Sequence, residues 1–517
     1  MSAVQPSKYF EIDIFSHHFV VKNMSPRGAE LAKKFARNFI EYKWERGRRL
    51  PFQTFAAYIP RKNHIHFHIG QYKQWRAYLA DIGVPDHGFT EVTYGFVDPE
   101  PLNAPMLPTE LKPSRDYQDE IFHTYLKVPE PSWRKFVGID PGRGKTYLAS
   151  WAAAEYNFRI VGFLCPKFLK KWPSDLVENL GLAEEDIISV AGAASLMDVI
   201  ARAKEGTLTE KAILISNRTY MNYINLYEKH GDEILNMGYD CTPPEFCQVI
   251  RAGTRIKDEV HEEFFSMFKI DLYTHIPRAI SLSATLEDDD PFTESMYKIA
   301  YPVEERCKIV VRAKYITSYA LRYHIKKGEE LSTTERGSTM YSHIAFEKNF
   351  YSKRYSFLMK PYLELINERF EERFLTRFDP GQKCLIYAAS IQMCTTIVDF
   401  LKSKHPDLDI RRYVAEDPYD NLMNATVCVS TLGSAGTGHD IKGLITVLMT
   451  TSLRARKKNI QGPGRLRETP GVDMEFEYFT CMDVPKQVEY HVSKELLLPA
   501  RMKQCFLVDL PYTVGEK

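Results

Sequence analysis

Short apolar runs rich in β-branched residues alternate with stretches of helical pattern along most of this 517-residue chain. They fall into two clusters, at 114–300 and 379–485. Such runs with helices between them are typical of parallel β-sheets that helices cover on both faces. We therefore predict an α/β fold with two parallel-sheet domains. The runs are Ile160–Cys165, Ala212–Ser216, Ile280–Leu282, Cys384–Ala388, Thr426–Ser430 and Ile445–Thr450.

The first hundred residues have a different pattern and end at a proline-rich segment. Asp98–Pro113 holds five prolines, and each removes a backbone donor and restricts the residue before it. Phe10–Ile14 and His64–Ile69 alternate as strands do, and Arg27–Arg46 has the spacing of a helix. A small α+β domain is predicted here. The apolar face of its helix would consist of Ala32, Phe35, Ala36, Phe39 and Ile40.

These patterns divide the chain into four segments. Residues 1–104 form the small α+β domain, and 105–300 form the first parallel-sheet domain. The polar, helix-prone segment 301–378 is interpreted as a connection or helical insertion. Residues 379–517 form the second parallel-sheet domain with a C-terminal tail.

A glycine-rich loop at Gly138–Thr146 (GIDPGRGKT) leads into a predicted helix. Backbone N–H groups in such a loop can hold phosphates at the helix N-terminus. Lys145 would neutralise the β and γ phosphates of a nucleotide, and the Thr146 hydroxyl would bind Mg²⁺. Ile139 stands where the strict pattern has its first glycine. The candidate nucleotide-binding residues are Gly142, Arg143, Gly144, Lys145 and Thr146.

An acidic element, Asp258-Glu259-Val260-His261, lies downstream of this loop. Hydrolysis of a nucleoside triphosphate needs one carboxylate for the Mg²⁺ shell and another to orient or deprotonate the attacking water. Adjacent acids at a strand end can do both. The alternative is a solvated acidic turn, because Glu262 and Glu263 continue the negative charge.

The order of seven short motifs between Lys112 and Arg467 resembles that of superfamily 2 helicases, which are nucleic-acid motors with two RecA-like domains. The closest likeness is to the UvsW-type phage branch-migration helicases. The N-terminal domain, the segment LKPSRDYQDEIFHTYL and the segment STLGSAGTGHDIKGL carry this likeness. The motifs are Tyr117-Gln118, Gly142–Thr146, Pro166-Lys167, Asp258–His261, Ser283–Thr285, Thr431–Ile441 and Gln461–Arg467.

The resemblance implies roles for individual residues in binding and hydrolysing ATP. Gln118 would read adenine, Asp258 would contact Mg²⁺, and Glu259 would be the catalytic glutamate. His261 would link hydrolysis to the second domain. The motif that contains Ser283 and Thr285 would join the nucleotide site to nucleic-acid movement. In the second domain, the implied residues are Gly438 and Asp440 near the nucleotide, and Gln461 and Arg465 facing it across the cleft.

The last motif departs from the family pattern, whose final arginine would fall on Glu468. Arg467 is one place early, and on a helix one residue turns a side chain by about 100°. A local irregularity, for which Pro463 is a candidate cause, would swing Arg467 inward. Otherwise Arg465 is the main arginine finger. The sequence leaves both readings open.

Basic residues outside the nucleotide motifs are candidates for nucleic-acid contact, although the net charge of the chain is only +1. Arg27–Arg76 has 12 Lys and Arg against three acids, with aromatic residues between them, as in duplex- or junction-binding surfaces. A solvated helix face is the alternative. Near the motor motifs, the alternative to nucleic-acid contact is that the apolar residues pack a helix and the lysines are solvated. The candidates are Lys33, Arg37, Arg48, Arg49, Lys167, Lys170, Lys171 and Arg218. The segment Arg454–Lys458 is either a solvated basic loop or a contact with a nucleic-acid strand.

Two further features have simple interpretations. His64, His66 and His68 alternate along one strand, but no cysteine or acid cluster lies nearby in the sequence, so an exposed or groove-facing strand is favoured over a metal site. The nine cysteines contain no C-x-x-C pair, which favours buried free thiols in a reducing compartment.

We expect a cytoplasmic protein, in the host cell if it is phage-encoded, because the N-terminus has no signal-peptide layout and no apolar run is long enough for a membrane helix. The function expected is an ATP- and Mg²⁺-dependent DNA helicase or translocase that remodels branched DNA in replication, recombination or repair. One alternative is an RNA-directed helicase. Another is a binding or annealing protein with a weakened ATPase. Protein partners are not indicated.

Overall fold

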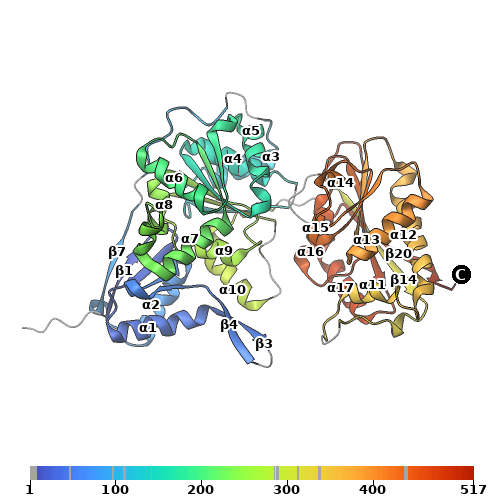
Figure 1. Ribbon diagram of the computed structural model, residues 1–517, viewed down its shortest axis with the longest axis horizontal. Coiled ribbons are helices and arrows are strands. Elements are labelled where there is room, and N and C mark those ends of the chain that lie inside the picture. The colour runs from blue at the N-terminus through green and yellow to red at the C-terminus, as the bar shows by residue number, and fades with distance from the viewer. Residues whose placement is uncertain are drawn as a thin grey trace, which may run out of the picture. The chain divides into compact units, whose positions relative to one another are not determined.

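The computed structural model describes residues 9–45, 48–95, 98–108, 112–140, 142–284, 286, 290–310, 314–335, 339–435 and 441–516 (Figure 1). Contacts divide the chain into two compact units. The first comprises Met1–Ile139 and Gly144–Val310, and the second comprises Asp140–Arg143 and Val311–Lys517.

A six-stranded parallel sheet forms the centre of the first unit, with the strand order β10-β11-β9-β12-β13-β8. Most of its strands are buried apolar runs, as helices on both faces require, whereas β10 is only partly buried and β12 has buried polar residues (Figure 1). The strands are β8 (Arg134–Gly138), β9 (Arg159–Leu164), β10 (Ile187–Val190), β11 (Ala212–Ser216), β12 (Ala252–Lys257) and β13 (Arg278–Ser283). The helices are α3 (Asp116–Ile121), α4 (Lys145–Tyr156), α5 (Lys171–Leu180), α6 (Ala193–Glu205), α7 (Asn217–His230), α8 (Pro243–Val249), α9 (Phe264–Asp271) and α10 (Pro291–Ala300).

The N-terminal part of the first unit has a smaller, five-stranded sheet of order β5-β6-β2-β1-β7, in which only the β1–β7 pair is parallel. Trp75 is fully buried and its ring lies 5.1–5.9 Å from those of Phe10, Phe35 and Phe67. The predicted small α+β domain is therefore confirmed. Its elements are β1 (Phe10–Ile14), β2 (His18–Lys22), α1 (Pro26–Ala36), β3 (Ile40–Glu45), β4 (Arg48–Thr54), β5 (Ala57–Ile59), β6 (His64–His68), α2 (Tyr72–Asp81) and β7 (Phe89–Thr93).

The helix predicted over Arg27–Arg46 is shorter than expected. Helix α1 ends at Ala36, a 3₁₀ turn covers Arg37–Phe39, and β3 follows as one strand of a hairpin with β4. The prediction was wrong from Arg37 onward because Ile40 fits both patterns. It continues the helical spacing, and it also begins the alternation of the segment IEYKWE.

Two of the three histidines of strand β6 are buried and His64 is partly exposed, which corrects the expectation of an exposed or groove-facing strand. His66 and His68 are 3% and 1% exposed, because this face of the N-terminal sheet packs on α9 and the residues after it. His66 Nδ1 lies 3.0 Å from the Leu272 carbonyl oxygen, and burial lowers the pKa of His66 to about 3. These histidines are neutral parts of an interface inside the first unit.

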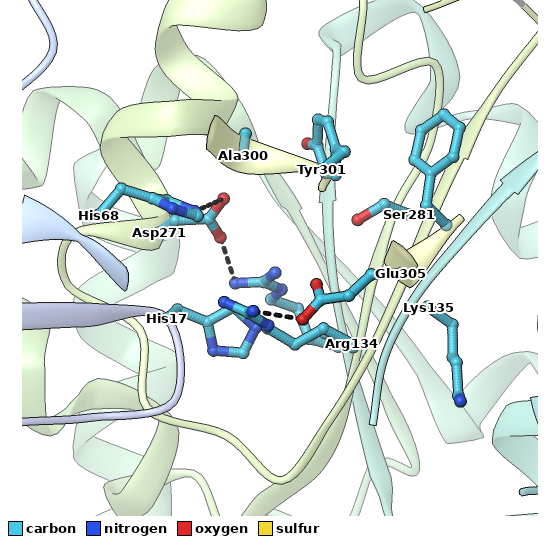
Figure 2. A pocket seen from close by; sticks show the side chains of 12 residues that line it. His17, His68, Arg134, Lys135, Asp271, Ser281, Ala300, Tyr301 and Glu305 are labelled. Atoms are coloured by element: carbon cyan, nitrogen blue, oxygen red, sulfur yellow. Dashed lines mark hydrogen bonds and ion pairs between the residues drawn. The ribbon is translucent and has the colours of Figure 1, made fainter. Parts of the chain in front are cut away.

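A buried ionic cluster joins the N-terminal sheet to the parallel sheet (Figure 2). The Asp271 carboxylate accepts hydrogen bonds from Arg255 Nη1 at 2.5 Å and Lys257 Nζ at 2.8 Å, and His68 Nε2 lies 3.6 Å away. Burial alone would raise the pKa of Asp271, but the charges of Arg255 and Lys257 outweigh it and hold that pKa well below its ordinary value. A second pair, Arg134–Glu305, lies beside it.

The second unit has a seven-stranded parallel sheet of order β16-β17-β15-β18-β19-β14-β20. Its strands are β14 (Ile316–Ile325), β15 (Lys383–Ala388), β16 (Ile410–Tyr413), β17 (Val427–Thr431), β18 (Leu444–Met449), β19 (Met474–Cys481) and β20 (Gln504–Val514). Its helices are α11 (His343–Asn349), α12 (Met359–Arg373), α13 (Ile391–Lys404), α14 (Tyr419–Asn424), α15 (Leu432–Ala435), α16 (Arg456–Gln461) and α17 (Pro485–Leu497).

The segment 301–378 does more than connect two domains. It supplies α11 and α12, as a helical insertion would, but it also supplies β14, which lies between β19 and β20. Tyr323 of β14 is buried with its ring 6.2 Å from that of Tyr362 of α12. Most of this segment thus belongs to the core of the second unit.

All nine cysteines are free thiols, and seven of them are buried, as the sequence predicts. Within the described ranges, no group of three or more His, Cys, Asp or Glu side chains is arranged to hold a metal ion. Among the described helices, none has the length and apolar character needed to span a bilayer.

We predict that Asp271→Asn lowers the unfolding free energy of the first unit by about 3–5 kcal/mol, because it leaves Arg255 and Lys257 buried without a counter-charge. Adding Lys257→Met should restore part of the loss. All five tryptophans (44, 75, 133, 151 and 172) lie in this unit, so tryptophan fluorescence during urea unfolding follows it selectively.

Asp198→Asn serves as the matched control, because the Asp198 side chain is 60% exposed and lies 3.9 Å from Arg202. This control should unfold at the wild-type urea concentration. Equal unfolding curves for Asp271→Asn and Asp198→Asn would contradict a structural role for the buried cluster.

Candidate nucleotide site

The glycine-rich loop connects β8 to α4. Gly142 and Gly144 both have φ of +77°, a left-handed conformation that glycine adopts without strain. A Cβ atom on Gly144 would lie 2.3 Å from Gln118 Nε2, so a side chain at this position would displace Gln118. The loop therefore needs both glycines, and the first turn of helix α4 presents its backbone N–H groups there.

Lys145, the first residue of α4, is buried and points back across the loop. Its Nζ donates to the carbonyl oxygen of Ile139 at 3.2 Å and lies 3.6 Å from Glu259 Oε1. The Ile139 side chain is fully buried, so it replaces the expected glycine without facing the loop's surface. Arg143 is buried in the same turn, and Thr146 follows Lys145 on the helix with its side chain partly exposed.

Gln118 lies on α3 and is held beside the loop by a local hydrogen bond. Its Oε1 accepts from the backbone N–H of Arg115 at 2.9 Å, and its side chain is 5% exposed. The amide end meets the backbone at Gly144. The structure thus brings the residue predicted to read adenine next to the residues predicted to hold phosphates.

The acidic pair follows directly after β12. Asp258 is buried, and its Oδ2 accepts a hydrogen bond from Trp172 Nε1 at 2.9 Å, while Oδ1 accepts from the Glu259 backbone N–H at 2.8 Å. Glu259 has φ of +45°, a strained conformation for a residue with a side chain. Burial and the neighbouring Glu259 charge raise the pKa of Asp258 to about 6. Two adjacent carboxylates with this repulsion form a donor set that suits a hard cation such as Mg²⁺.

His261 connects the acidic element to the neighbouring strand β13. Its Nδ1 lies 2.6 Å from Ser283 Oγ and 3.3 Å from Glu259 Oε2. Because β12 and β13 are adjacent and parallel, their carboxyl ends place these groups at one edge of the sheet. Thr285, expected to act with Ser283, is outside the described residues.

Trp172 is the residue whose role the sequence understated. Its side chain is fully buried, as expected of an apolar residue that packs a helix. It also donates the hydrogen bond that orients Asp258. Its position seven residues after Cys165, at the start of helix α5, gives no sign of this contact, because Asp258 lies 86 residues later in the chain.

The basic residues near the motor motifs are bound to acids of the same unit. Lys167 pairs with Glu262, and Arg218 donates to Glu263 from Nε at 3.1 Å and from Nη2 at 2.6 Å. The acids beyond His261 are therefore ion-pair partners rather than a purely solvated turn. Lys170 is exposed, and Lys171 lies 3.7 Å from Asp175.

In the N-terminal domain, the four candidate contacts are exposed. Lys33 lies on α1, Arg37 on the turn after it, and Arg48 and Arg49 on β4. The alternative of a plain solvated helix face does not describe Arg48 and Arg49, because they lie on a strand.

The last motif lies in the second unit and is not a continuous helix. Helix α16 ends at Gln461, a 3₁₀ turn covers Pro463–Arg465, and Leu466 is extended. The helical rotation argument therefore does not apply to Arg467. Arg465 is 7% exposed, and Arg467 is partly exposed and donates to the Gly464 carbonyl oxygen at 2.6 Å. Gly438 and Asp440 are outside the described residues.

No protein-family model matches the chain, and no curated protein matches it. Similar solved structures include S. cerevisiae Dbp5 bound to RNA and ADP BeF3, with 10% identity, a TM-score of 0.49 and coverage of 77% of this chain and 90% of that chain. T4 UvsW has 11% identity and a TM-score of 0.33, and covers 97% and 99% of the two chains. The Pyrococcus furiosus Hef helicase domain has 13% identity, a TM-score of 0.43 and coverage of 74% and 98%.

The two parallel sheets, each covered by helices, confirm the predicted α/β fold with two parallel-sheet domains. The small α+β domain precedes them. The three solved structures share 10–13% of their residues with this chain and cover at least 74% of it.

Proposed function

We propose that this protein is an ATP-hydrolysing nucleic-acid motor. The observation that carries the proposal is the convergence of Lys145, Asp258 and Glu259 at one edge of the first parallel sheet, beside a loop with two left-handed glycines. A buried lysine next to an acidic pair, at the N-terminus of a helix, suits a phosphate chain with a divalent cation.

Each residue has a distinct task in this reading. Lys145 neutralises the terminal phosphates, and Gln118 reads the base. Glu259 orients and deprotonates the attacking water. Thr146 and Asp258 would hold Mg²⁺, which supplies charge neutralisation of the phosphates when bound.

Two groups complete the proposed site. The hydrogen bond between His261 and Ser283 ties the acidic element to the strand that leads into the coupling motif. Arg465, supported by Arg467 and Gln461, is the proposed source of positive charge from the second unit, which also contains Gly438 and Asp440.

The nucleic acid that we propose is branched DNA, which the motor would unwind or remodel by migrating junctions or regressing forks. The support is the excess of exposed cations on the N-terminal domain and the sequence likeness to branch-migration helicases. Replication, recombination or repair would be the setting.

Glu259→Gln should reduce ATP turnover by about 10²–10⁴-fold while leaving ATP binding intact, because it removes the base but keeps the shape of the side chain. Steady-state phosphate release and binding of a fluorescent ATP analogue measure the two effects. Glu155→Gln is the matched control, because Glu155 pairs with Lys127 on the surface of the same unit. Near-normal turnover in Glu259→Gln would refute the assignment.

Trp172→Phe should raise the Mg²⁺ concentration for half-maximal ATP turnover by roughly tenfold, because the hydrogen bond that orients Asp258 is lost. The smaller ring also leaves a cavity, which lowers stability and which the Trp151→Phe control reproduces. Turnover at saturating Mg²⁺ should change much less. Trp151→Phe makes the same change in a ring stacked on Phe122 at 3.8 Å and should leave the Mg²⁺ titration unchanged. The same Mg²⁺ requirement in Trp172→Phe and Trp151→Phe would disprove the positioning role of Trp172.

The nucleic-acid preference is tested by measuring ATP turnover with duplex DNA, four-way junctions, single-stranded DNA and RNA of matched length. We expect the largest stimulation with junctions. Stimulation by RNA alone would replace the proposal with an RNA-directed motor. No stimulation by any of them, with intact binding, would indicate an annealing protein with a weakened ATPase.

A further inference from the structure

Strands β3 and β4 form a hairpin that belongs to neither sheet of the first unit (Figure 1). Their register pairs Ile40 with Thr54 at the base and Glu45 with Arg48 at the far end, with a bulge between Glu41 and Tyr42. The backbone N–H of Phe55 donates to the carbonyl oxygen of Phe39 at 2.8 Å, which closes the base.

Both faces of the hairpin are open to solvent. Every residue from Arg48 to Phe52 is exposed, with Leu50 at 44% and Phe52 at 49%. A two-stranded hairpin without a buried face is marginally stable in water. Its shape is supported by two cation–π contacts, in which Lys43 Nζ lies 3.1 Å from the Phe52 ring centre and the Arg49 guanidinium lies 4.4 Å from that of Tyr42.

One group of cations in this region has acidic partners, namely Arg27 with Glu30, Arg61 with Glu233, Lys62 with Asp232, and Arg76 with Asp86 and Glu91. Lys73 on α2 is exposed and forms no ion pair with the described acids. Within the described ranges, no ion pair involves the cations of the hairpin and of the helix end that leads into it. This second group is Lys33, Lys34, Arg37, Lys43, Arg48 and Arg49.

The composition of the hairpin favours a nucleic acid over a protein strand as its partner. Pro51 in β4 lacks a backbone donor, and exposed lysine and arginine oppose the addition of another strand at a sheet edge. The same features suit phosphates, and a two-stranded ribbon fits the groove of a duplex. Exposed rings beside the cations suit bases that have lost their stacking partner.

The base of the hairpin is fixed to the motor. Phe55 follows β4 directly and is buried among four rings, at 5.9 Å from Phe264, 5.1 Å from Phe265, 4.9 Å from Phe268 and 5.6 Å from Phe292. Three of these belong to α9, the helix that begins just after the acidic element. The base of the hairpin thus packs on the helix that follows the acidic element of the nucleotide site.

We infer that the β3–β4 hairpin binds branched nucleic acid at the point where a duplex ends. Lys43, Arg48 and Arg49 bind backbone phosphates on either side of the branch. The rings of Tyr42 and Phe52 lie on opposite faces of the hairpin, and each stacks on a base exposed on its own side of the branch. This inference rests on the proposed function only in taking a nucleic acid as the partner.

Two full-length variants separate the roles. The charge variant carries Lys43→Gln, Arg48→Gln and Arg49→Gln, and the ring variant carries Tyr42→Ala and Phe52→Ala. Binding is measured by fluorescence anisotropy with a three-way DNA junction, the blunt duplex and the single strand across a salt series. A junction with 2-aminopurine at the branch point reports stacking.

The charge variant should lower the slope of log Kd against log salt by about 2–3 on the junction, because each lost phosphate contact removes roughly one counterion release. The ring variant should keep the wild-type slope and weaken junction binding about tenfold. It should also abolish the fluorescence response at the branch point. Neither change should alter the single-strand affinity by more than about twofold.

The controls are Lys204→Gln, an exposed cation on α6, and Leu235→Ala, a side chain that is 43% exposed elsewhere on the same unit. Both should bind all three probes as the wild type does. Wild-type junction binding in both hairpin variants would overturn the inference, and so would an equal loss on all three probes. Basal ATP turnover, measured without nucleic acid, should stay unchanged in every variant. Its absence in the wild type would count against the proposed function alone.

Discussion

The Asp271 carboxylate, buried between Arg255, Lys257 and His68, holds together the parts of the first unit on which the site depends. Asp271 is the last residue of α9, and the first turn of that helix comes just after the acidic element. The C-terminal end of this short helix is fixed by the buried ionic cluster, and its N-terminal end follows the acidic element. The acidic pair is therefore held between strand β12, which it follows directly, and helix α9.

The same helix makes the N-terminal domain an integral part of the unit. His66 contacts the carbonyl oxygen of Leu272, and Phe55 packs on the rings of α9. Removing the domain would expose these rings and uncover Asp271, so a truncated protein would lose more than a binding surface. The exposed side chains of the hairpin contribute to no buried core, which is why they can be changed without this consequence.

How far the sequence predicts this structure depends on whether the contacts involved are local. Six core strands follow from their apolar runs, because a strand that is buried on both faces shows a continuous apolar segment. Strand β12 (AGTRIK) was not among the predicted apolar runs, because its polar residues are buried by contacts that lie outside the strand. Helix α1 was extended too far because Ile40 satisfies two periods at once. The burial of His66 and His68 was missed because their neighbours on α9 lie about 200 residues later. Pro463 was a visible reason for an irregular last motif, but its effect on Arg467 needed the backbone.

Lys167 and Arg218 are predicted to contact nucleic acid, and their ion pairs with Glu262 and Glu263 are compatible with that prediction. Both cations contact acids, yet their side chains are 36% and 70% exposed. Exposed pairs of this kind contribute at most about 1 kcal/mol, since water and salt screen them. A phosphate that approached either cation would compete with Glu262 or Glu263 at little cost. The pairing therefore lowers the charge available to a distant nucleic acid, while a phosphate at contact distance can still bind there.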